Sequence, residues 1–152
     1  MTGVVRAGFE LTEHTADVGV RAWGSSVGEV FEQAALATVS LEYDLETVRP
    51  ADATTVVVEA PERDLLLAAW LNELIYLIDG ERWVFARFQV DAVGAIEDAD
   101  GRSAWSLRAT AIGERRDARR HAVRTLVKAA TLHGLALRHT SHGWVGEVLL
   151  DV

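Results

Sequence analysis

Two aspartates stand at the ends of two strand-like segments, one near each end of the chain. Asp17 opens "DVGVRAW", whose apolar residues alternate with other residues as in a half-buried β-strand. Asp151 lies near the end of "WVGEVLLDV", a second apolar segment that favours a strand. A charged side chain at a strand end is most often solvated, so neither aspartate alone predicts a site.

The two aspartates become informative if their strands pair. The two ends of a small domain often lie close together, so such a pairing is reasonable. Two carboxylates a few ångströms apart repel each other, and a hard divalent cation, which prefers oxygen ligands, removes that repulsion. The α-carboxylate of Val152 adds a third anionic group beside Asp151. We therefore expect a divalent metal site formed by Asp17, Asp151 and Val152.

Oxygen ligands do not specify one ion. Ca²⁺, Mg²⁺ and Mn²⁺ all accept carboxylates, so we take Ca²⁺ as the first candidate and Mg²⁺ and Mn²⁺ as alternatives. A second pattern, "HTSH" with His139 and His142, has metal-ligand spacing, but its place in a presumed turn makes it a much less specific signal.

The composition excludes several classes of protein. The chain has 152 residues, enough for one domain (1–152) with its own core, and 49% of them are apolar. It contains no cysteine, which excludes disulfides, thiolate metal sites and a cysteine nucleophile. No apolar run has the length of a membrane span or of a signal-peptide core, so we expect a soluble, cytoplasmic protein without a membrane partner.

Charge is distributed unevenly along the chain. Residues 108–138 contain eight basic and two acidic residues, a net charge of +6, whereas the whole chain carries −8 and the remainder therefore −14. A basic segment on an acidic body suits phosphates or an acidic protein surface, or is simply solvated. The net negative charge argues against extensive nucleic-acid binding, so any RNA contact is expected to be indirect or weak.

The elements that must position these residues follow from hydrophobic periodicity. Residues 25–44 have helical spacing behind the capping pair Ser26 and Glu29, and a second, mostly apolar helix follows Pro61 and ends at Gly80. Residues 121–134 predict a short helix, although their β-branched residues also permit a strand. Strand patterns occupy the remaining apolar segments: 4–12, 17–23, 54–60, 82–93, 104–112, 135–139 and 143–152. This order predicts an α+β fold with a mixed sheet, two longer helices and one short helix.

Four blocks, in this order, resemble the archease family: "EHTADVGVRAWG", "WLNELIYLID", "VKAATLHGL" and the terminal "VLLDV". The resemblance covers nearly the whole chain, and the first two blocks are specific as a pair. The chain departs from the family pattern at Leu132, where an aromatic residue usually precedes the histidine.

The resemblance implies a function that composition does not. Archeases are small, non-enzymatic accessory proteins with an SHS2-like α+β fold that hold a divalent ion on acidic residues. They activate the RtcB-type RNA ligase, which joins 2′,3′-cyclic-phosphate and 5′-hydroxyl ends in tRNA splicing and RNA repair. They promote guanylylation of the ligase by GTP and allow multiple turnovers. The ligase is therefore the expected partner.

The family motifs also imply roles for particular residues. Asp17 and Asp151 correspond to the acidic metal ligands, and Glu13 and His14 lie beside the first of them. Lys128 and the nearby His133 fall in the third block, as secondary candidates for metal binding or partner activation. Lys128 is the only lysine among fifteen basic residues, which favours a specific role at a phosphate or carboxylate.

Two other functions stay open from the sequence. The carboxylates, with His14 and His133, could activate water in a metal-dependent phosphoesterase. Alternatively, the chain is a general chaperone-like modulator of RNA-modifying enzymes.

Overall fold

The computed structural model describes residues 6–13 and 16–152. In chain order, these residues form the following elements: β1 (Gly8–Glu13), β2 (Asp17–Gly24), α1 (Val27–Glu42), the 3₁₀ helix η1 (Leu45–Thr47), β3 (Asp52–Ala60), α2 (Arg63–Gly80), β4 (Trp83–Glu97), β5 (Ser103–Arg115), β6 (Ala129–Thr140) and β7 (Gly143–Asp151). The α+β class predicted from the sequence is confirmed.

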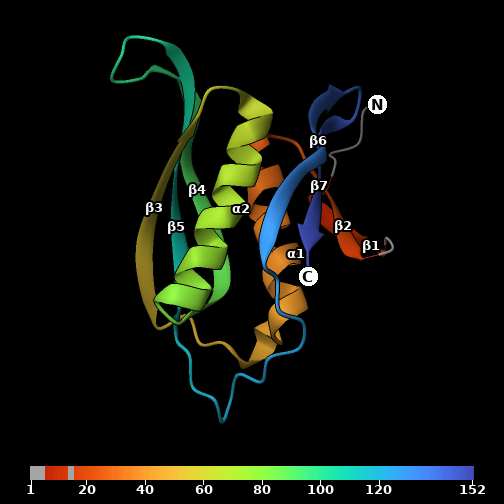
Figure 1. Cartoon of the computed structure of the whole chain (residues 1–152), viewed down its shortest axis with the longest axis vertical. Helices are drawn as coiled ribbons and strands as arrows, with labels where there is room; N and C mark the ends of the chain where they lie inside the picture. Colours follow the sequence, from red (N-terminus) through yellow and green to blue (C-terminus); the bar gives the residue numbers. More distant parts are fainter. Residues whose placement is uncertain (1–5, 14–15) are drawn as a thin grey trace.

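Two antiparallel sheets enclose the two long helices (Figure 1). One is a four-stranded sheet in the order β1-β2-β7-β6, and the other a three-stranded sheet in the order β3-β5-β4. Every described strand pair is antiparallel, so the expected single mixed sheet is replaced by two antiparallel sheets. Side chains from both sheets and both helices form one buried apolar cluster.

The helices begin and pack as their sequences predict. Ser26 caps α1, because its hydroxyl accepts the backbone N–H of Glu29 at 3.1 Å. The nearly all-apolar surface of α2 is explained by its place between the sheets. Its Trp70 is fully buried and donates its ring N–H to the carbonyl of Phe31 in α1 at 2.9 Å. This bond ties the two helices together.

A glycine of β7 permits both helices to approach the four-stranded sheet closely. A Cβ atom at Gly146 would lie 2.8 Å from Val30 of α1 and 3.1 Å from Leu67 of α2. The first distance is shorter than real Cβ contacts and the second is tighter than most of them, so a side chain at this position would force the side chains of Val30 and Leu67 to move. The sequence therefore needs glycine here to keep β7 against the core.

The predicted short helix over 121–134 is wrong. Residues 121–128 have no regular secondary structure, and β6 begins at Ala129. The strand is favoured because its backbone pairs with β7, whereas an isolated helix this short is marginal in water. Gly134, the last residue of the predicted helix, has φ +69° inside an irregular stretch of β6 between Thr131 and Ala136.

None of the described helices is long and apolar enough to span a membrane.

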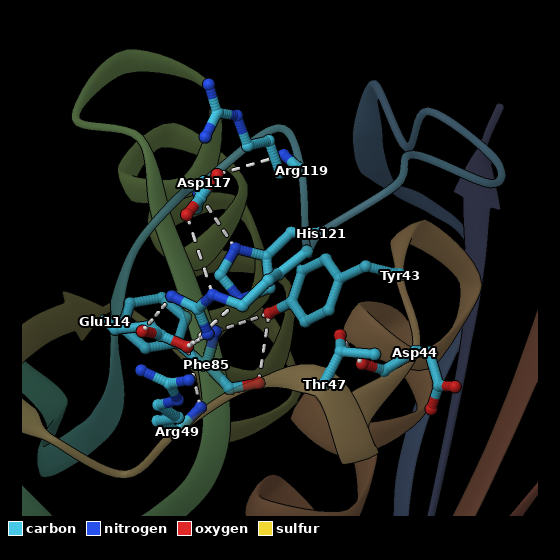
Figure 2. A network of polar contacts seen from close by, with 10 residues as sticks. Tyr43, Asp44, Thr47, Arg49, Phe85, Glu114, Asp117, Arg119 and His121 are labelled. Carbon is cyan, nitrogen blue, oxygen red and sulfur yellow. Dashed lines mark hydrogen bonds and ion pairs between the residues drawn. The ribbon is translucent and has the colours of Figure 1, made fainter.

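Tyr43, at the end of α1, forms hydrogen bonds with the backbone of β4 where that strand is irregular (Figure 2). The register of β4 against β5 shifts between Phe85 and Arg87. The buried Tyr43 hydroxyl accepts the backbone N–H of Phe85 at 2.6 Å and donates to the carbonyl of the same residue at 3.1 Å. One side chain thus satisfies both polar groups of Phe85 at the shift.

Tyr43→Phe removes this hydroxyl and leaves both backbone groups of Phe85 buried without a partner. We expect the free energy of unfolding to fall by about 2–3 kcal/mol, measured by urea denaturation. The matched control is Tyr76→Phe, because Tyr76 is exposed, and it should change stability by less than about 0.5 kcal/mol. Equal stability of the two variants would show that the Tyr43 hydroxyl is dispensable.

Candidate functional site

The pairing of β2 with β7 places Asp17 directly opposite Asp151. Directly opposed residues of an antiparallel pair share a face, with Cβ atoms about 4.5–5.5 Å apart. The structure therefore brings together the two carboxylates that the sequence analysis singled out. Their role as metal ligands stays a prediction.

The apolar residues of both strands fix this register. Val20 and Ala22 of β2, and Val148 and Leu150 of β7, are buried on the face that meets the helices. A slip of one residue would turn these side chains toward solvent, so only the observed register is stable. Asp17 is an odd number of residues from this buried row, as is Asp151, and both aspartates therefore lie on the outer face of the sheet.

Lys128 lies next to the aspartate pair. Its backbone N–H donates to the carbonyl oxygen of Asp151 at 2.8 Å, and its side chain is exposed. Ala129, the next residue, pairs with Asp151 from β6. The structure therefore ties the backbone of the one lysine of the chain to the strand that carries Asp151, and a role of its side chain stays a prediction.

Asn72 of α2 holds this part of β6 in position. Its amide group donates to the carbonyl of Ala130 at 3.1 Å and accepts the N–H of the same residue at 2.8 Å. Ala130 follows Lys128 by two residues, so the pair of bonds fixes the backbone beside the aspartates. Sequence reasoning missed this role, since its only local signal is an isolated amide in an apolar helix.

A hollow of about 390 Å³ lies on the outer face next to the aspartate pair. Gly19 and Leu149 contribute to its lining, and each lies two residues from an aspartate on the same face. His133 also lines it, from the irregular stretch of β6. Arg21 and Glu147 line the hollow as well, and they belong to a row of exposed ion pairs in which Arg21 lies 3.6 Å from Glu10 and 3.7 Å from Glu147. His133 thus belongs to the wall of the hollow, and its role as a ligand stays a prediction.

Among the other predicted ligands, Glu13 lies apart from the pair. Glu13 pairs with Val18, which places it on the opposite face from Asp17. His14 lies outside the described residues. The side chain of Val152 packs against the hydrophobic core, and its carboxylate stays a predicted ligand. Of the less specific histidine pair, His139 stacks on Trp144 with ring centroids 4.6 Å apart.

The donor set of the site fits a hard divalent ion incompletely. Two opposed carboxylates are ligands that such an ion prefers, and the hydroxyl of Thr131, on the same side of the neighbouring strand, is buried without a hydrogen-bond partner. No group of three or more acidic, histidine or cysteine side chains among the described residues is arranged so that it could hold a metal ion. An ion here would therefore keep several coordination positions for water or for a second molecule.

A serine near this sheet has hydrolase-like spacing but a structural role. "GSSVG" (24–28) matches G-x-S-x-G, and it lies between a strand and a helix. A nucleophilic serine of that motif sits on a sharp, strained turn, whereas Ser26 has extended backbone angles, φ −139° and ψ 161°. Its hydroxyl is occupied as the cap of α1. The spacing therefore reflects helix capping.

A second polar network joins the end of β5 to the loop that follows it (Figure 2). Glu114 accepts two hydrogen bonds from Arg120, at 2.8 and 3.0 Å, and these lower its pKa to about 2. His121 is buried, and its Nδ1 accepts the backbone N–H of Asp117 at 2.8 Å. The Nε2 atom of His121 therefore carries the proton and donates to Glu114 at 3.0 Å.

Glu42 is a buried carboxyl at the C-terminal end of α1. Its Oε1 accepts the backbone N–H of Val127 at 2.9 Å, and burial raises its pKa to about 7 despite that bond. Its carbonyl oxygen accepts the N–H of Arg124 at 2.7 Å, and that of Leu41 accepts the N–H of Thr125 at 3.0 Å. The loop thereby satisfies carbonyls that a helix end leaves free.

The raised pKa of Glu42 predicts how stability depends on pH. The folded state holds a proton that the unfolded chain releases near pH 4.5, so this carboxyl weakens the fold as pH rises toward 7. Glu42→Gln keeps an acceptor for Val127 without a charge. We expect it to be more stable than the parent by about 1–3 kcal/mol at pH 8, and close to the parent at pH 4.

Urea denaturation at the two pH values measures this difference. Glu46→Gln, at an exposed position, should follow the parent at both. A Glu42→Gln variant that is less stable than the parent at pH 8 would show that the ionised carboxylate is accommodated.

Comparison with known proteins agrees with this architecture. The model of the archease protein family (MTH1598/TM1083) matches residues 9–152. "Protein archease" of Methanosarcina mazei is 38% identical over 144 residues, 95% of each chain, and that of Pyrococcus furiosus is 34% identical over 145 residues, 95% of this chain and 98% of its own. The solution structure of Methanobacterium thermoautotrophicum protein 1598 is similar with a TM-score of 0.76 and 32% identity, covering 95% of this chain and 99% of that one. The chain belongs to the archease family.

Proposed function

We propose that this archease is an accessory protein that activates an RtcB-type RNA ligase, promoting its guanylylation and repeated turnover in tRNA splicing or RNA repair. Membership of the family supports the ligase as partner. The single observation that supports the acidic site is the register that sets Asp17 opposite Asp151. Both side chains lie on the face of the sheet away from the helices, where a partner can reach them. We place this function in the cytoplasm.

Asp17 and Asp151 hold a divalent ion, with Ca²⁺ as the first candidate and Mg²⁺ or Mn²⁺ as alternatives. When bound, such an ion neutralises and orients phosphate oxygens. The two aspartates supply fewer ligands than the six to eight oxygens that Ca²⁺ takes. The remaining positions are therefore open to the nucleotide or to side chains of the ligase.

The chain's own contribution is positioning. Asp17 and Asp151 stand on paired strands whose register the core fixes, so their carboxylates are held in place before the ligase arrives. Lys128, whose backbone bonds to Asp151 and whose side chain is exposed, provides a compact positive charge for a phosphate or carboxylate of the complex. The proposal places no covalent intermediate on this chain.

Guanylylation of the ligase by radiolabelled GTP tests the proposal, with and without this protein. Asp17→Ala and Asp151→Ala should each reduce the stimulation at least about tenfold, because one carboxylate cannot hold the ion alone. Glu10→Ala is the matched control, since it removes an exposed carboxylate from the same sheet, and it should stimulate normally.

Full stimulation by both aspartate variants, with unfolding midpoints equal to the parent's, would remove the acidic pair from the function. Hydrolysis of phosphate esters by this protein alone, in Mn²⁺ or Mg²⁺ and lost in the aspartate variants, would instead establish the phosphoesterase. Comparable stimulation of unrelated RNA-modifying enzymes would indicate a general chaperone-like modulator.

A further inference from the structure

The segment between β5 and β6 presents apolar side chains to solvent. Val123 is 47% exposed and Leu126 54% exposed in this segment, which we define as residues 116–128. Tyr76 of α2 is 60% exposed. These are three of the six large apolar side chains exposed in the described part of the chain. Exposed apolar side chains that gather in one place often mark a protein contact.

The backbone of the segment is anchored although it has no regular structure. The N–H groups of Arg124, Thr125 and Val127 all donate to the end of α1, at 2.7 to 3.0 Å. His121 and Val127 are buried, at 1% and 0% exposure, and the two exposed apolar residues lie between them in the sequence. The anchored backbone therefore holds Val123 and Leu126 outward, and a partner would bind them with little loss of backbone entropy.

Tyr76 lies on the side of α2 along which the segment passes. Residues four apart share a helix face, so Tyr76 follows Asn72, which bonds to Ala130 just beyond the segment. One turn further along, Asp79 lines a small cavity together with Val123 and Leu126. Figure 1 shows the segment passing below the end of α2 and rising beside it. The three exposed side chains thus belong to one region, which we call the apolar patch.

The segment that carries Val123 and Leu126 is basic, whereas Asp79 of α2 is an acidic residue beside them. Residues 116–128 contain five basic residues and one acidic residue, a net charge of +4 on a chain of −8. Arg119 and Lys128 are exposed, and the Arg124 side chain is 58% exposed with only a 3.6 Å contact to Asp44. An apolar centre with arginine around it is the composition of a protein interface, and its charge selects an acidic partner.

We propose that the apolar patch, Tyr76 with Val123 and Leu126, is a docking surface for a folded protein with an apolar depression rimmed by aspartate and glutamate. Resting on the function proposed above, that protein is the ligase. The end of the segment, Lys128, bonds to Asp151 through its backbone, so docking here also fixes where the aspartate pair meets the partner. Branched aliphatic side chains contribute nothing to phosphate binding, so the observations favour a protein over RNA.

Binding to the immobilised ligase, measured by surface plasmon resonance, tests the proposal. The double variant Val123→Ser/Leu126→Ser should raise the dissociation constant at least about tenfold, mainly through faster dissociation. Arg119→Glu should slow association, with an effect that shrinks as salt is raised. Val57→Ser is the matched control, since Val57 is 55% exposed on the three-stranded sheet, and it should bind as the parent does.

Guanylylation assays separate docking from the acidic site. The double variant should regain full stimulation at concentrations above its new dissociation constant, whereas Asp17→Ala should not regain it at any concentration. If the parent binds and stimulates and the correctly folded double variant binds equally well, the docking proposal alone is overturned. If the parent neither binds nor stimulates the ligase, the proposed function fails and the docking proposal with it.

A nucleic-acid role for the segment would give a different pattern. In that case the protein would bind a single-stranded RNA oligonucleotide, and Arg119→Glu would abolish this binding. Ligase binding would be unchanged in both the double variant and Arg119→Glu. These results together would overturn the docking proposal in favour of RNA. The proposal predicts the reverse: ligase binding is sensitive to both changes, and RNA binding is negligible at 0.15 M salt.

Discussion

The antiparallel pairing of β2 with β7 is the constraint on which the candidate site depends. It joins strands from near the two ends of the described chain and sets Asp17 opposite Asp151. Because side chains alternate along a strand, a slip of one residue would set Asp17 opposite Leu150, on the other face. The buried row on the inner face forbids that slip. The placement of two like charges opposite each other is thus a consequence of packing the core.

Three closely spaced backbone anchors connect this register to the rest of the molecule. The backbone of Val127 bonds to Glu42 at the end of α1, that of Lys128 to Asp151 of β7, and that of Ala130 to Asn72 of α2. Residues 127–130 therefore bond to both helices and to the strand that carries Asp151. This arrangement makes the acidic site and the proposed docking surface parts of one rigid unit, so that a partner held by one is oriented for the other.

Local patterns predicted the elements more successfully than their contacts. Ser26 begins α1 as its capping spacing predicts, and the turn before Gly143 joins the last two strands as expected. The helix expected over 121–134 failed, because long-range bonds to Glu42 and β7 decide that segment and leave no periodic signal. The roles of Tyr43 and Asn72 were not predicted for the same reason, since their hydrogen-bond partners lie 42 and 58 residues away in the sequence. The meeting of the two aspartates was a matter of register, which sequence periodicity alone cannot supply.

The most direct test of the acidic site is an NMR titration of the isolated protein with paramagnetic Mn²⁺, which broadens signals close to the ion. The account predicts that signals of Asp17 and Asp151 broaden first, together with those of their neighbours on the outer face. It also predicts that Asp151→Asn abolishes this broadening at the same Mn²⁺ concentration. Broadening centred on His139 and His142, or a pattern unchanged in Asp151→Asn, would contradict it.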